Sequence, residues 1–154
     1  MIGVPQADGE TCAILYNKCY GGFEYSATAL HEYSVITGSN TNEYTYIARN
    51  DPIMIGLFQK HGSKWMSGAH ARLELAIFPL HFRHALLLHE YDGRETITVD
   101  YKQFVLHEIT RLVAVDGPTV VQDIRALLQQ YADELISLEE QVTRNARGQL
   151  LPHV

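Results

Sequence analysis

The sequence has very little cysteine. Only Cys12 and Cys19 are present among 154 residues, and they lie seven positions apart. So few cysteines in a chain of this length are typical of a protein from a reducing compartment, where disulfides are rare. On one continuous strand the two side chains would point to opposite faces. We therefore expect two free thiols rather than a structural bridge.

Positive charge and long apolar runs are also scarce. The chain carries 12 Lys and Arg against 18 Asp and Glu, a formal net charge of −6. This balance argues against sequence-independent nucleic-acid binding and against attraction to an anionic membrane, because both need a basic surface. No apolar run reaches the 18 or so residues of a membrane-spanning helix, and no secretory leader opens the chain. We expect no membrane segment and no secretion.

The residues that are present suit a globular domain. Hydrophobic residues make up 46% of the chain, enough for a core without disulfides, a metal or a cofactor. In the first half, apolar runs, helical spacing and turn residues predict a strand at 12–16, a helix at 27–37, a strand at 44–48 and a helix that begins at Pro52, with Asp51 as its N-cap, and fades near 61–62.

The second half continues the mixed pattern. A strand at 71–79 is expected to be central, and Asp92-Gly93 predicts an antiparallel hairpin with arms at 85–91 and 95–99. The stretch 100–115 fits a helix better than a strand. Together these elements predict a compact α+β fold, with one small mixed or antiparallel sheet of about four strands covered by helices.

A strict seven-residue repeat marks the C-terminal part. Asp116-Gly117-Pro118 can start a helix, which we expect over 116–146 as a unit added to a core domain at 1–115, with 147–154 as a tail. The helix can cover its own domain, or it can form a coiled coil with a protein partner or a second copy. The interaction residues expected in the second case are Val121, Ile124, Leu128, Tyr131, Leu135, Leu138 and Val142.

The glycine pair Gly21-Gly22 lies between a predicted strand and a predicted helix. A phosphate-binding turn, a packing device or a plain corner would each use such a pair. The corner is favoured, with one glycine at positive φ and with Tyr20 and Phe23 packed in the core, because no nucleotide-binding fingerprint is present. The phosphate-binding alternative would use Asn17, Tyr20, Gly21, Gly22 and Ser26.

Other chemistry-bearing residues have simpler structural roles. His81, His84 and His89 are close in sequence, but an extended chain would not bring them onto one metal, so no metal site is expected. Cys19 with His31 is a weak signal for a nucleophile. Among the carboxylates, Asp51 is expected to cap a helix and Asp92 to form a turn, with Glu90 and Glu95 as a cross-strand pair. No residue is therefore expected to be catalytic.

Four segments follow one another in an order that resembles a known pattern. They are "LYNKCYGGFEYSATAL", "RNDPIMIGLFQKHG", "GAHARLELAIFP" and "HEYDGRETI". The chain resembles a family of small uncharacterised proteins of large DNA viruses and tailed phages, with the pattern N-x-C-Y-G-G-F, R-x-D-P and E-Y-D-G-x-E over residues 12–98. The matching residues are Asn17, Cys19, Tyr20, Gly21, Gly22, Phe23, Ser26, Arg49, Asp51, Pro52, Gly62, Gly68, Ala71, Leu73, Pro79, Glu90, Tyr91, Asp92, Gly93 and Glu95.

The resemblance implies a viral protein but no activity. The expected helix after Pro52 is more apolar and more basic than the pattern's acidic helix, and the heptad helix lies outside the pattern. We expect a non-enzymatic protein that binds other proteins in the host cytoplasm or the virion, as a minor structural (capsid-associated) component or a host-interaction factor. The alternative is a protein that binds or cleaves a phosphorylated molecule at Gly21-Gly22.

Overall fold

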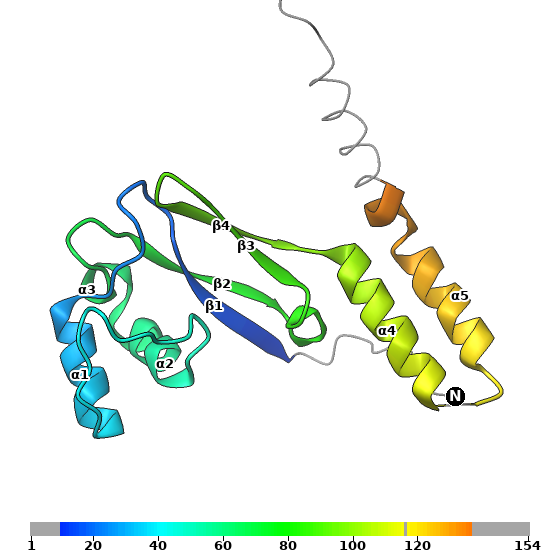
Figure 1. Cartoon of the computed structure of the whole chain (residues 1–154), viewed down its shortest axis with the longest axis horizontal. Coiled ribbons are helices and arrows are strands. Elements are labelled where there is room, and N and C mark those ends of the chain that lie inside the picture. The colour runs from blue at the N-terminus through cyan, green and yellow to red at the C-terminus, as the bar shows by residue number, and fades with distance from the viewer. Residues whose placement is uncertain (1–9, 116, 137–154) are drawn as a thin grey trace, which may run out of the picture. The chain divides into compact units, whose positions relative to one another are not determined.

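The computed structural model describes residues 10–115 and 117–136, and these form an α+β structure (Figure 1). The chain divides into two compact units, Gly9–Thr98 and a second that begins at Val99. We call them the core unit and the helical unit. The core unit coincides with the range of the viral-family pattern, whereas the sequence had suggested a boundary before Asp116.

The core unit is built on one antiparallel strand pair. Strand β1 (Thr11–Asn17) pairs with β2 (Leu73–Pro79), with Thr11 opposite Pro79 and Asn17 opposite Leu73. The strands predicted at 12–16 and 71–79 are confirmed. The expectation of one four-stranded sheet with 71–79 at its centre was wrong, because β2 pairs only with β1 in the described chain and the other two strands form a separate sheet.

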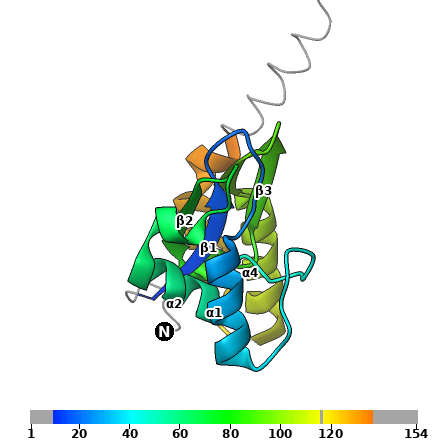
Figure 2. The same cartoon turned by 90° about the vertical axis from the view of Figure 1, so that its left-hand side faces the viewer.

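Three helices pack around this strand pair (Figures 1 and 2). Helix α1 (Ala27–Thr37) begins where the Ser26 hydroxyl accepts from the Ala29 N–H, and it ends at Gly38 in the left-handed conformation. Both ends confirm the prediction. The core that they enclose consists of Leu15, Ala29, Leu30, Ile47, Met54, Leu57, Met66 and Leu73.

Helix α2 (Pro52–His61) also begins and ends as predicted. The Asp51 carboxylate accepts from the Ile53 and Met54 N–H groups, and Pro52 occupies the first turn, where a missing N–H costs nothing. A short helix α3 (Ser63–Met66), which the sequence did not indicate, follows directly and places Met66 in the core.

The strand predicted at 44–48 is absent, and this segment is an irregular loop. The Asn42 side chain accepts from the Tyr44 N–H at 2.9 Å, and the Thr45 hydroxyl accepts from the Asn42 N–H at 3.0 Å. Side chains that bond the nearby backbone in this way compete with strand pairing. The aromatic and β-branched residues of this segment had suggested a strand. In the loop that forms instead, its tyrosines are exposed to solvent.

The hairpin forms as predicted. A short 3₁₀ helix, η1 (Leu80–Phe82), leads to β3 (Leu86–Tyr91), and the turn at Asp92-Gly93 leads to β4 (Arg94–Val99). Asp92 has φ +50° and Gly93 has φ +81°, the two positive angles that a tight two-residue hairpin needs.

Glu90 and Glu95, which were expected to flank the hairpin as a cross-strand pair, have different hydrogen-bond partners. Glu90 accepts a hydrogen bond from the Gly93 N–H within the turn, whereas Glu95 is buried. A buried carboxylate is stable only with donors around it, and the core unit supplies Glu95 with a cation and a backbone N–H.

The helical unit contains α4 (Tyr101–Val115) and α5 (Val120–Gln130), which lie side by side (Figure 1). The helix predicted at 100–115 is confirmed. Helix α5 begins after Thr119 and ends at Tyr131, and residues 132–136 are helical beyond that break. It is therefore shorter than the helix predicted at 116–146, of which residues 116 and 137–146 lie outside the described residues.

The buried face of α5 matches the predicted heptad seam only in part, because it includes Leu127, which is not a seam residue. Leu127 and Tyr131 are buried, with the Tyr131 ring 5.1 Å from that of Phe104 on α4. Val121 and Leu128 are exposed. Ile124 and Leu135 are half-buried, and Leu138 and Val142 lie outside the described residues. An interaction through the exposed residues stays a prediction.

None of the helices in the described part of the chain has the length and apolarity to cross a bilayer.

Candidate functional site

The glycine pair forms a corner that two other loops pack against. Gly22 has φ +89°, which confirms that one of the pair takes a positive angle. At Gly21 a Cβ would overlap the backbone oxygen of His70, and at Gly93 a Cβ would press against the backbone nitrogen of Gly22. Three segments far apart in sequence thus approach one another closely enough to require glycine.

Asn17, fully buried at the end of β1, ties these three segments together. Its amide nitrogen donates to the backbone oxygens of Cys19 and Gly93, each at 2.7 Å. Its amide oxygen accepts from the Arg72 N–H at 2.8 Å. A buried amide with its hydrogen bonds satisfied in this way stabilises the fold and has no free group for a ligand.

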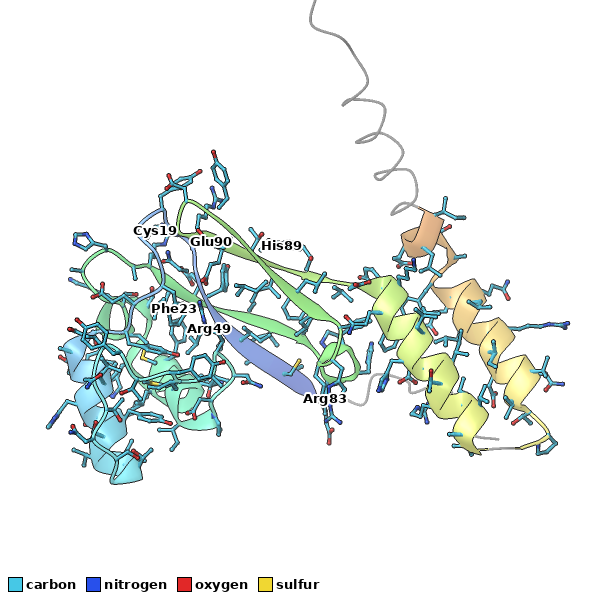
Figure 3. The ribbon with its side chains drawn as sticks, in the orientation of Figure 1. Cys19, Phe23, Arg49, Arg83, His89 and Glu90 are labelled. Carbon is cyan, nitrogen blue, oxygen red and sulfur yellow. The ribbon has the colours of Figure 1, made fainter. Side chains whose placement is uncertain are left out.

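Next to Asn17 lies an ion pair between the half-buried Arg49 and the buried Glu95. The Glu95 carboxylate accepts two hydrogen bonds from the Arg49 guanidinium, both at 2.6 Å, and one from the Asn17 backbone N–H at 2.8 Å. The Arg49 guanidinium also stacks on the Phe23 ring, 3.4 Å from its centroid (Figure 3). Glu95 and Arg49 therefore neutralise each other and fix β4 to the glycine corner.

The remaining residues of the predicted phosphate site have other surroundings. The Ser26 hydroxyl donates to the Trp65 oxygen as well as capping α1, so both of its functions are internal. Tyr20 is exposed, so the prediction that it packs in the core was wrong, while Phe23 packs against the core cluster as expected. A phosphate site at this corner stays a prediction. The Asn17 and Ser26 side chains do not favour it, because their polar groups are already bonded within the fold.

The residues weighed for catalysis and metal binding also have internal partners. Asp51 caps α2 and accepts from the Tyr33 hydroxyl at 3.2 Å. The Cys19 thiol donates to the His70 backbone oxygen at 3.2 Å, and both cysteines are free thiols. In the described part of the chain, no group of three His, Cys, Asp or Glu side chains is placed to hold a metal ion.

A hollow lies beside the ion pair, within the core unit. Its volume is about 240 Å³. We call it the Tyr25 pocket. It is lined by the corner, by the start of α1 and by the loop that replaces the predicted strand, through Phe23, Glu24, Tyr25, Leu30, Asn42, Glu43, Thr45, Tyr46, Ile47 and Arg49.

Tyr25 provides an unsatisfied polar atom at this pocket. Its hydroxyl oxygen is buried and has no hydrogen-bond partner within the described residues. Burial raises the pKa of the Tyr25 phenol, a rise that Arg49 opposes and the Asp51 carboxylate reinforces. The group is therefore a neutral hydroxyl at physiological pH, buried within the wall of the pocket.

Two tyrosines project from the loop that borders the pocket. Tyr44 is 87% exposed and Tyr46 is 88% exposed, although both lie in a segment fixed by the hydrogen bonds of Asn42 and Thr45. Ile47, next in the chain, is buried in the core cluster and anchors the loop. Large aromatic side chains held in solvent by an ordered loop are typical of binding surfaces.

The charged groups around the Tyr25 pocket are mostly acidic. Glu24 and Glu43 are exposed at its wall, and neither carboxylate forms an ion pair with any described residue. The one cation in the lining, Arg49, is already paired with Glu95. The pocket therefore presents uncompensated negative charge beside aromatic rings.

A second hollow of about 250 Å³ lies at the hairpin, between Tyr20 and the strands β3 and β4, where Figure 3 labels His89 and Glu90. Arg94 lies over the Tyr20 ring at 5.7 Å and donates to its hydroxyl at 3.5 Å. The His89 ring shares a hydrogen bond with the Thr98 hydroxyl, and the Glu90 carboxylate accepts from the Gly93 N–H. Because these polar groups already have partners within the chain, the hollow offers a ligand less than the Tyr25 pocket does.

The sequence analysis missed the Tyr25 pocket. The pattern at 44–48 predicted a strand and so placed Tyr44 and Tyr46 in it. A signal was present in "SNTNEYTY" at 39–46, where turn-forming polar residues continue up to the tyrosines.

Comparison with known proteins found no matching family model, no matching curated protein and no matching solved structure.

Proposed function

We propose that this protein is a non-enzymatic binding protein that recognises a protein partner through the Tyr25 pocket and the adjoining Tyr44 and Tyr46. The observation that carries the proposal is the pair of fully projecting tyrosines on a hydrogen-bonded loop beside an open pocket. Tyrosine provides a large contact area at a low cost in conformational entropy, and it is enriched among residues that dominate binding energy.

The polar residues outside the Tyr25 pocket support a binding role over a catalytic one, because their side chains hold the fold together. Asn17, Ser26, Asp51 and Glu95 each complete hydrogen bonds that hold the fold. A general acid or base needs to reach a substrate, and these groups are turned towards the chain itself.

The resemblance to viral proteins adds a proposal about where this protein acts. The residues of its pattern meet at the glycine corner, where Asn17, Gly21, Gly22, Gly93 and Glu95 interlock. A scaffold of this kind can hold a variable binding loop, which fits a minor virion component or a factor that contacts host proteins.

A site-specific crosslinking experiment tests the binding surface. A photoreactive phenylalanine analogue replaces Tyr44 or Tyr46 in the full chain, with Ile77, an exposed residue of β2, as the matched control position. We expect a protein adduct of one discrete mass from positions 44 and 46 and none from position 77. Equal adducts at all three positions, or none at any, would contradict the proposal.

The proposed setting has a separate test. Peptides of this protein should be detected by mass spectrometry in purified particles of the virus that encodes it if it is a virion component. If they are present only in infected cells, the host-interaction role is favoured. Detection in neither would remove the viral part of the proposal.

A further inference from the structure

We infer that the Tyr25 pocket receives the cationic side chain of an arginine or lysine from the protein partner. This inference rests on the proposed function and adds the chemistry of the group that the pocket binds. It is carried by the pocket's charge, its aromatic lining and its size.

The charge of the pocket favours a cation. Glu24 and Glu43 line it without ion-pair partners in the described chain, while Arg49 is neutralised by Glu95 through two 2.6 Å hydrogen bonds. Asp51 adds a further carboxylate within electrostatic reach of Tyr25. A phosphate or carboxylate ligand would meet this negative charge with no free cation in the lining to offset it.

The aromatic and apolar groups of the lining suit the same ligand. Tyr46 stands at the exposed edge of the pocket, and its ring face can attract an ammonium or a guanidinium group. The Tyr25 side chain, also in the lining, adds a second aromatic residue next to Phe23, whose ring it meets edge to face at 4.9 Å. The buried side chains of Leu30 and Ile47 offer apolar contact to the methylene groups of a lysine or an arginine.

The volume of the pocket limits what enters. Sites for drug-sized ligands and cofactors occupy roughly 300–1,000 Å³. The Tyr25 pocket, at about 240 Å³, is smaller and suits one side chain better than a nucleotide. The exposed Tyr44 and Tyr46 beside it would then contact the partner's backbone and neighbouring residues.

Binding of blocked amino acids to the full-length protein tests the inference. The probes are N-acetyl-arginine amide and N-acetyl-lysine amide, with N-acetyl-citrulline amide as an uncharged control of nearly the same shape, and inorganic phosphate. Chemical shifts of the backbone amides are followed by NMR. We expect saturable shifts in residues 23–25 and 42–47 with arginine or lysine, at least tenfold weaker with citrulline, and a loss of affinity on raising the salt concentration.

Variants separate charge from shape. Glu24→Gln and Glu43→Gln should each weaken the arginine probe severalfold, whereas Glu10→Gln, which removes an exposed carboxylate outside the pocket, should not. Equal binding of citrulline, or shifts at the pocket with phosphate instead, would overturn the inference.

The outcomes distinguish this inference from the proposed function. If crosslinking at Tyr44 and Tyr46 yields the partner but neither basic probe binds, the binding surface stands and the cationic ligand is wrong. If the basic probes bind the pocket but no partner is crosslinked, the pocket recognises a cation and the proposed protein-binding function is wrong.

Discussion

Tyr25 has a buried hydroxyl that nothing in the described chain satisfies, whereas the hydroxyl of Tyr33 donates to Asp51. An unsatisfied buried polar group costs about 1–3 kcal/mol. We predict that Tyr25→Phe raises the free energy of unfolding by about 1 kcal/mol and that Tyr33→Phe lowers it by up to about 1 kcal/mol. Urea unfolding measures both. A loss of stability in Tyr25→Phe would mean that its hydroxyl has a partner.

The same Tyr25 variant has a signature at high pH. Burial raises the pKa of the folded-state phenol above the value of about 10 that it has in the unfolded chain. The folded state therefore holds this proton more tightly, so the contribution to stability is complete below about pH 10 and is lost as the pH rises beyond it. Tyr25→Phe should make stability fall less steeply above pH 10, and an unchanged slope would contradict this cause.

A second prediction at the scale of residues concerns the Arg49–Glu95 ion pair. Removing one partner of a fully buried ion pair costs about 3–5 kcal/mol, and the 30% exposure of Arg49 makes this an upper limit for the present pair. Glu95→Ala should lower stability by up to that amount. The double variant Arg49→Met with Glu95→Leu should lose clearly less, because no isolated charge remains. Similar losses in both, measured by chemical denaturation, would mean that packing rather than charge sets the cost.

The two glycines of the corner should respond differently to alanine. At Gly22 only the backbone angle is unfavourable, which costs roughly 1–2 kcal/mol. At Gly21 the added methyl group would overlap the His70 backbone, so the loop must move. We predict a larger fall in melting temperature for Gly21→Ala than for Gly22→Ala. The reverse order would show that the corner tolerates the methyl group.

At the scale of elements, α5 offers two neighbouring leucines with opposite environments. Leu127 is 4% exposed and Leu128 is 42% exposed. Full burial of a leucine is worth roughly 1.5–3 kcal/mol, and placing a charge there costs more. Leu127→Asp should unfold the α4–α5 pair, and Leu128→Asp should leave its helical circular dichroism intact.

The same pair tests the oligomer expected from the heptad repeat. If Leu128 meets a second chain, Leu128→Asp should convert an oligomer to a monomer in light scattering without unfolding it. An unchanged molecular mass would indicate that the exposed seam residues have no such role.

The elements that the sequence predicted correctly are those with strong local signals. Ser26, Gly38, Asp51 and Pro52 mark helix ends by bonds within one turn, and Asp92-Gly93 sets its hairpin through two backbone angles. Such signals need no knowledge of distant residues. Helix ends and turns were therefore predictable, and so was the α+β class.

The elements that were missed depend on distant partners. Residues 44–48 can form a strand only where another strand offers a free edge to pair with. The prediction of a four-stranded sheet was wrong for the same reason. The role of Glu95 depends on Arg49 and Asn17, which are 46 and 78 positions away. The Tyr25 pocket combines two separate stretches, 23–30 and 42–49, so the local signal at 39–46 could indicate its loop but not the pocket.

At the scale of the whole molecule, the core unit contains all eight residues of the main core cluster, from Leu15 to Leu73. We predict that a fragment of residues 9–98 folds cooperatively, with the amide spectrum of its core residues close to that of the full chain. A fragment that stays unfolded would show that the core unit needs the rest of the chain.

The interlocked corner has a consequence for how the protein folds. Asn17 contacts Gly93 across 76 positions and Arg72 across 55. Contacts between distant positions slow folding, because a long loop must close before they form. On the ribosome, the Arg49–Glu95 bond beside the Tyr25 pocket cannot form until Glu95 has emerged. A nascent chain that stops before the hairpin turn therefore leaves Arg49, which lines the pocket, without its carboxylate partner.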